Sequence, residues 1–94
     1  MQPADLKVIQ TKVKSVLRQY VFGLSYPDTW KEIRDELGGL FVNDRRIYDW
    51  MVVCDKTNNF SGTLRQGILY VDVALNGNDG SGFYYMTFRL KGLP

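Results

Sequence analysis

The single cysteine of the chain, Cys54, lies in the segment DWMVVCDKTNN at residues 49–59, beside acids and amides that could assist a nucleophile. A cysteine attacks its substrate as the thiolate, and enzymes commonly use a neighbouring imidazole to generate that ion. The sequence contains no histidine. Cysteine proteases, Ser-His hydrolases and His-ligated zinc enzymes are therefore disfavoured.

Alternation along a strand predicts a structural position for Cys54 instead. Every second residue of a strand points to the same face. The two sets are Tyr48, Trp50, Val52 and Cys54 on one face, and Ile47, Asp49, Met51 and Val53 on the other. On the first face Cys54 would be a small buried hydrophobic residue with an unreactive thiol, while a catalytic thiol is the alternative.

Carboxylates offer a second candidate for chemistry. Asp49, Asp55 and Asp72 could form a hydrolytic site, but no phosphate-binding glycine loop or basic clamp accompanies them. We therefore predict a protein that is not an enzyme, with no catalytic residues, no cofactor and no bound metal.

Composition indicates one compact domain over residues 1–94. The chain has 45% hydrophobic and 14% aromatic residues, enough for a single core at this length. Twelve basic and ten acidic residues leave a charge of +2, which does not indicate a nucleic acid or an anionic membrane as partner. No apolar run has transmembrane length, no secretion signal is predicted, and one cysteine cannot close an internal disulfide.

Two amphipathic helices are predicted, over about 5–22 and 28–41. Apolar residues recur every three or four positions, as one helical face requires. They are Leu6, Ile9, Val13, Leu17 and Tyr20 in the first helix, and Trp30, Ile33, Leu37, Leu40 and Phe41 in the second. Opposite the first set, Lys7, Lys14 and Arg18 form a basic stripe that could contact an acidic partner, or simply face solvent.

Three strands are predicted over about 47–55, 68–75 and 83–90, where β-branched and aromatic residues concentrate. The first link, KTNNFSGTLRQG, reads as a long hairpin connection, and the second, NGNDGSG, as a tight reversal or a flexible hinge. The predicted fold is α+β, with both helices on one face of a small, mainly antiparallel three-stranded sheet that strands of neighbouring subunits could complete.

The last predicted strand is apolar on both faces, which suggests that a partner covers the second one. We predict that this strand is donated to a neighbouring chain or receives one. A central position within its own sheet is the alternative. The intersubunit residues would be Phe83, Tyr84, Tyr85, Met86, Thr87, Phe88, Arg89 and Leu90.

This order of helices and strands resembles the C-terminal domain of contractile-tail sheath proteins of myovirus phages and related injection machines. In that family a tyrosine-aspartate-aromatic strand leads through two valines and a cysteine to an aspartate, one variable residue and threonine-asparagine-asparagine. The matching positions are Tyr48, Asp49, Trp50, Val52, Val53, Cys54, Asp55, Thr57, Asn58 and Asn59. The similarity extends over about residues 6–90, except that NGNDGSG replaces the family's lysine-proline pair and arginine-serine step.

The resemblance implies a structural, self-assembling part of a contractile tail, located in the virion and assembled in the host cytoplasm. Its partners would be copies of itself or of the sheath subunit, and a tail tube or baseplate protein, with no membrane. A stand-alone tail adaptor, terminator or baseplate component is the nearer alternative. Asp55, Thr57, Asn58 and Asn59 are expected to stabilise a turn by bonds from side chain to backbone.

A small RNA-binding module is the more distant alternative. It would use aromatic residues on the sheet, with nearby arginines for the phosphates. The candidates are Tyr70, Tyr84, Tyr85, Arg65 and Arg89. The small net charge argues against a nucleic-acid partner.

Overall fold

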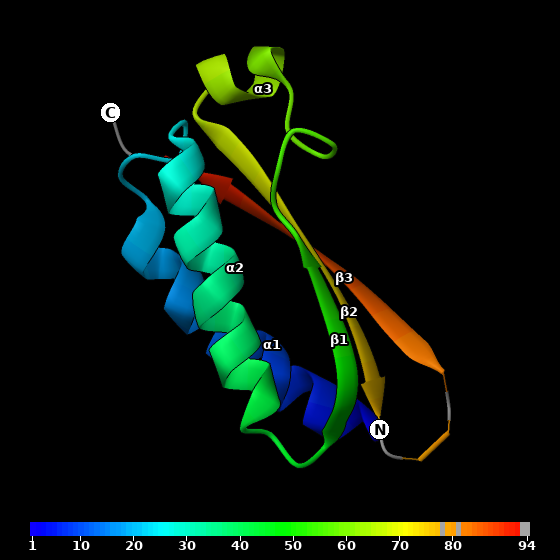
Figure 1. Cartoon of the computed structure of the whole chain (residues 1–94). Helices are drawn as coiled ribbons and strands as arrows, with labels where there is room; N and C mark the ends of the chain where they lie inside the picture. The colour runs from blue at the N-terminus through cyan, green and yellow to red at the C-terminus, as the bar shows by residue number, and fades with distance from the viewer. Residues whose placement is uncertain (78, 81, 93–94) are drawn as a thin grey trace.

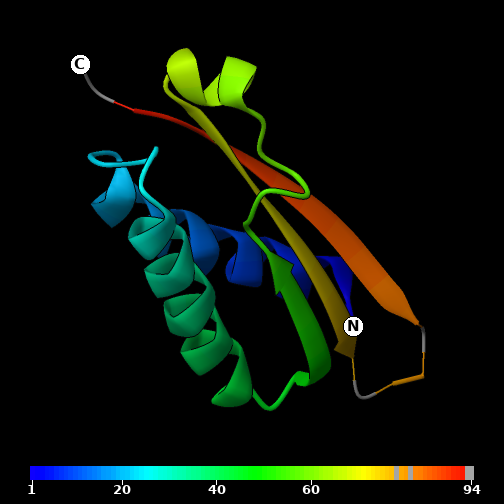
Figure 2. The same ribbon diagram turned by 45° about the horizontal axis from the view of Figure 1, so that its top comes forward.

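The computed structural model describes residues 1–77, 79–80 and 82–92 and confirms the predicted α+β fold (Figure 1). The helical elements are α1 (Pro3–Leu17), the 3-10 turn η1 (Arg18–Tyr20), α2 (Pro27–Val42) and α3 (Ser61–Arg65). The strands are β1 (Ile47–Val53), β2 (Ile68–Gly77) and β3 (Phe83–Lys91). Figure 2 shows α1 and α2 on the same side of the sheet.

The sheet has the order β1-β2-β3, and both pairings are antiparallel. β2 is therefore the central strand, and β3 lies at an edge. The predicted connection at 76–82 includes Asn78 and Ser81, which lie outside the described residues. On either side of it, β2 and β3 of the same chain pair from Ile68 with Lys91 to Asn76 with Phe83.

The core lies between the sheet and the two long helices. The predicted helical spacing places the buried side chains toward β2, as an amphipathic helix requires. The buried residues are Ile9, Val13 and Leu17 of α1, Trp30, Ile33, Leu37 and Phe41 of α2, and Leu69, Val71, Val73 and Leu75 of β2. Leu6, Tyr20 and Leu40 of the predicted faces are only half-buried.

The first helix differs at both ends from the predicted 5–22. It begins at Pro3, where proline lacks only an N–H that would be unpaired anyway, and Asp5 accepts a bond from the backbone N–H of Gln2 at 3.2 Å. It ends at Leu17 and tightens into η1. The chain then turns at Gly23, whose φ of +76° is open to glycine at little cost.

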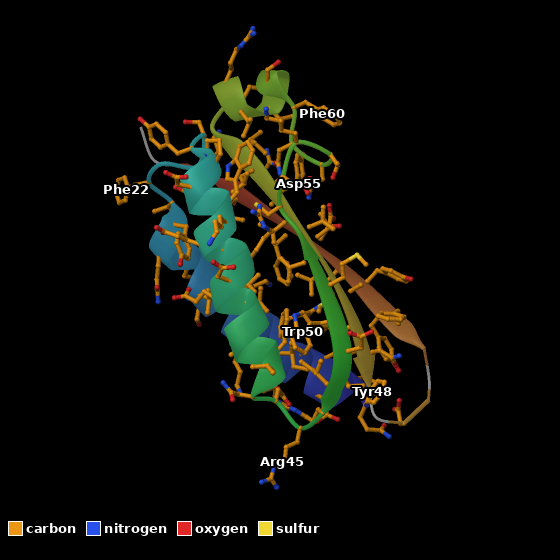
Figure 3. All side chains as sticks on the ribbon, viewed as in Figure 1. Phe22, Arg45, Tyr48, Trp50, Asp55 and Phe60 are labelled. Atoms are coloured by element: carbon orange, nitrogen blue, oxygen red, sulfur yellow. The ribbon has the colours of Figure 1, made fainter. Side chains whose placement is uncertain are left out.

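A β-bulge overturns the predicted position of Tyr48. Ile47 pairs with Gly77 but Asp49 with Asn76, so one extra residue is inserted between them. The alternation shifts there: Ile47 is buried on the same side as the half-buried Trp50, while Tyr48 is 72% exposed. Figure 3 shows Trp50 between β1 and the helices and Tyr48 on the opposite side of the strand.

The long connection between β1 and β2 contains a short helix that the polar sequence did not predict. α3 covers five residues, Ser61–Arg65, and Gly67 closes it with a φ of +77°. β1 also stops at Val53, two residues before the predicted end, while β2 and β3 extend to Gly77 and Lys91. None of the helices in the described part of the chain has the length and hydropathy needed to cross a membrane.

Candidate functional site

The direction of the backbone groups of β3 follows from one hydrogen bond. The N–H of Gly92 donates to the carbonyl of Gly67 at 2.6 Å, just beyond the strand ends. Bonded and non-bonded pairs alternate along an antiparallel ladder. Counting back through the unbroken register, Leu90 bonds to Leu69 and Phe88 to Val71. The residues between them direct N–H and C=O away from β2.

Those residues form the outer edge of the sheet. They are Phe83, Tyr85, Thr87, Arg89 and Lys91. No other described segment pairs with β3, and among residues 1–77, 79–80 and 82–92 no side chain bonds to their backbone groups. We call these groups the β3 edge. An unpaired edge of this kind is a template on which another strand can add.

The opposite edge of the sheet, along β1, is partly covered. The same alternation directs the backbone groups of Trp50, Val52 and Cys54 outward. The Asp49 carboxylate accepts the Trp50 N–H at 2.9 Å, and the Arg34 guanidinium from α2 donates to the Cys54 carbonyl at 2.5 Å. Two of the outward backbone groups of β1 are thus occupied by side chains, so the two edges of the sheet are not equivalent.

A groove of about 340 Å³ runs between α1 and the β3 edge. It is lined by Lys14, Leu17, Arg18 and Val21 on the helix side and by residues 87–91 on the strand side. Leu17, Phe88 and Leu90 are buried, and they form an apolar floor. A strand added to β3 would lie about 4.8 Å from it and would cover this groove.

Only part of the predicted basic stripe of α1 lines this groove. Lys14 and Arg18 line it, together with Arg89 and Lys91 of β3. Lys7 lies elsewhere, in a separate hollow on the exposed side of α1 that Lys14 also lines. The structure therefore brings two of the three predicted contact residues beside the predicted intersubunit strand.

The side chains of the predicted intersubunit strand divide between two faces. Tyr84, Met86, Phe88 and Leu90 point to the helices, and the last two are buried. Phe83, Tyr85, Thr87 and Arg89 are exposed on the outer face, where Tyr85 shows 80% of its surface. The apolarity of the first face is explained by the core, and the second face is open.

The turn residues replace the missing end of β1. Asp55 accepts bonds from the Thr57 N–H at 2.8 Å and hydroxyl at 2.5 Å, and these bonds lower the pKa of its carboxyl. Asn59 accepts the Tyr70 N–H at 2.7 Å and donates to the Tyr70 carbonyl at 2.9 Å. Asn58 donates to the Val53 carbonyl and the Asp72 carboxylate, both at 2.8 Å. The Asn59 amide thus takes the ladder position beside Tyr70.

The surroundings of Cys54 are those of a core residue. Its side chain is fully buried, and burial raises the pKa of the thiol to about 12. A thiol with such a pKa is protonated at neutral pH and unavailable as a nucleophile.

The three aspartates that were candidates for a hydrolytic site do not form one cluster. Asp49 pairs with Asn76, which is four residues along β2 from Asp72, a separation of about 13 Å at the usual rise per residue. Asp55 and Asp72 lie at the same turn, where Asn58 accepts the Asp55 N–H and donates to the Asp72 carboxylate. Within the described residues no group of three histidine, cysteine or acidic side chains could hold a metal. Tyr84 faces the helices, opposite to Tyr70 and Tyr85, so the tyrosines do not form one stacking platform.

Two important contacts were absent from the sequence analysis. Arg34 was not singled out, although a basic residue between two core positions of α2 could have suggested a contact with the sheet. The basic groove was also missed because Arg89 and Lys91 are far from Lys14 and Arg18 in the chain.

No protein-family model, no curated protein and no solved structure matches this chain.

Proposed function

We propose that the protein is a structural, self-assembling part of a contractile phage tail, a sheath-like module that packs around the tail tube and interlocks with neighbours by strand pairing. The observation that carries this proposal is the β3 edge, unpaired along its described length, whereas Asp49 and Arg34 occupy two outward backbone groups of the β1 edge. Backbone pairing links subunits with little dependence on their outer side chains, so the link tolerates movement of the joined domains.

Two further features support the proposal. The segment from Tyr48 to Asn59 carries the residues that resemble the sheath family, and the same segment builds the end of β1 and its turn. The outer face of the sheet also exposes large apolar side chains, among them Met51 and Tyr85. A partner that adds a strand at the edge could cover part of this face.

The partners would be copies of this chain or of a sheath subunit, and a tube or baseplate protein, in a virion assembled in the host cytoplasm. A stand-alone adaptor, terminator or baseplate component would use the same edge. Both versions require strand pairing between chains.

A proline substitution tests the pairing. The N–H of Thr87 points away from β2, so Thr87→Pro removes an edge donor and leaves the β2–β3 ladder intact. Thr87→Val is the matched control, because both variants lose the hydroxyl bond to Asp72 at 2.6 Å. We expect Thr87→Pro to abolish assembly in sedimentation velocity, alone or with the candidate partner, and Thr87→Val to assemble as wild type.

Circular dichroism would establish that both variants remain folded. Assembly of Thr87→Pro equal to that of Thr87→Val would contradict pairing at this edge.

A further inference from the structure

The groove beside the β3 edge concentrates positive charge. Lys14 and Arg18 stand on the helix side, and Arg89 and Lys91 on the strand side. All four are exposed, no carboxylate lines the groove, and none of the four forms an ion pair within the described part of the chain. Four unneutralised cations thus surround one groove on a chain with a charge of only +2.

The groove also distinguishes the two sides of any strand that enters it. Successive side chains of a strand point to opposite faces. Those directed to α1 would meet the buried Leu17, Phe88 and Leu90. Those directed to the outer face would lie beside the exposed side chains of Arg89 and Lys91, which share that face.

Resting on the function proposed above, we propose that the β3 edge receives an extended segment in which acidic residues alternate with apolar ones. The apolar residues cover the groove floor, and the acidic residues pair across the strands with Arg89 and Lys91. Lys14 and Arg18 add attraction from the helix side and accelerate the encounter. The groove prefers an acidic segment because of its charge, whereas any extended segment could form the backbone hydrogen bonds.

The same charges make β3 of a second copy a poor occupant. Pairing β3 with β3 along the groove would bring Arg89 and Lys91 close to their own counterparts, and like charges opposite each other destabilise a ladder. Basic residues on an edge are a known device against such self-pairing. The partner strand is therefore a different segment from β3.

Peptide fits the groove better than nucleic acid does. Single-stranded nucleic acid needs exposed aromatic rings on which bases stack. The one aromatic side chain that lines this groove within the described residues, Phe88, is buried at 8% exposure. An unpaired strand edge, in contrast, recognises a peptide backbone directly.

The test uses short fluorescein-labelled peptides that alternate valine with glutamate, glutamine or lysine, with binding followed by anisotropy at low and physiological salt. We expect the glutamate peptide to bind the wild-type protein about tenfold or more tightly than the glutamine peptide, and the difference to shrink as salt rises. The lysine peptide should not bind. Thr87→Pro should abolish binding of the glutamate peptide, and Thr87→Val should keep it.

Charge-reversal variants locate the effect. Arg89→Glu combined with Lys14→Glu should weaken the glutamate peptide about tenfold or more and allow the lysine peptide to bind. Lys7→Glu is the matched control, because Lys7 is on the same helix but outside the groove. It should leave both affinities close to wild type.

The outcomes separate this inference from the function on which it rests. Equal binding of the glutamate and glutamine peptides, both lost in Thr87→Pro, would overturn the acidic preference and leave strand pairing standing. Binding that survives in Thr87→Pro would overturn strand addition itself. Absence of binding by every peptide, or equal competition by a single-stranded oligonucleotide, would also overturn the inference.

Discussion

At Tyr70 the central strand loses its neighbour, because β1 has already ended at Val53. The amide of Asn59 replaces the missing strand by bonding both the N–H and the C=O of Tyr70, and it is almost fully buried while doing so. Removing a side chain that bonds two buried backbone groups destabilises the fold strongly, since water cannot reach the groups left without a partner.

Replacing Asn59 should therefore destabilise the protein strongly. We expect Asn59→Ala to lower the free energy of unfolding by about 2 kcal/mol. Asn43→Ala is the matched control, because the Asn43 amide also donates to a carbonyl, that of Gly39 at 3.0 Å, but in an exposed position. Its loss should lower the free energy of unfolding by no more than about 0.5 kcal/mol. Urea denaturation measures both. A loss in Asn59→Ala no larger than in Asn43→Ala would contradict this account of the turn.

The burial of the Cys54 thiol leads to a second prediction. Because Cys54 is fully buried and its pKa is raised to about 12, Ellman's reagent should label it only after unfolding. Met51→Cys, which places a second thiol at a position that is 60% exposed, should label rapidly in the native protein. Native labelling of Cys54 at the rate of that added thiol would contradict the burial and restore the catalytic alternative.

Among the elements, α2 continues through two glycines that lower helix propensity. Trp30, Ile33, Leu37 and Phe41 all face the core, so tertiary packing outweighs the local cost at Gly38 and Gly39. A Cβ at Gly39 would meet nothing within 4 Å, whereas at Gly23 the φ of +76° disfavours any side chain.

Alanine should therefore act in opposite directions at these two glycines. Gly39→Ala should raise the free energy of unfolding by about 0.5–1 kcal/mol, because alanine loses less backbone entropy in a helix. Gly23→Ala should lower it by about 1 kcal/mol, since the left-handed backbone is strained and the new Cβ would lie 3.2 Å from Tyr26. Thermal or urea denaturation tests both variants, and a stabilised Gly23→Ala would contradict the turn geometry.

The elements themselves were largely predictable because their hydrophobic periods are regular. The helical spacing around Ile33 indicated the correct element and its buried face, and the β-branched and aromatic residues around Val71 indicated the correct strand. The bulge at Tyr48 and the short helix α3 were not predictable from the sequence. Both depend on how the chain connects neighbouring elements, and no local sequence pattern indicates them. The order in which the strands pair could not be predicted from the sequence either, so the edge position of β3 became known only from the structure.

For the whole molecule, the difference between the two sheet edges matters most. Along β1 the carboxylate of Asp49 and the guanidinium of Arg34 occupy outward backbone groups, and along β3 the groups of Thr87 and its odd-numbered neighbours stay unpaired within the described residues. The groove beside the β3 edge has an apolar floor and basic rims. An added strand could therefore bury apolar side chains on the floor and pair acidic side chains with the basic residues. The β3 edge is therefore the edge at which the proposed strand pairing with another chain would take place.

Amide hydrogen exchange, resolved residue by residue, tests this claim most directly. In the isolated chain the N–H groups of Phe88 and Leu90 should exchange slowly, because they bond to β2, and those of Thr87 and Arg89 should exchange fast. On assembly, or on binding an added strand, Thr87 and Arg89 should become as protected as their neighbours. Unchanged fast exchange at Thr87 and Arg89 in the assembled state would contradict strand pairing at the β3 edge.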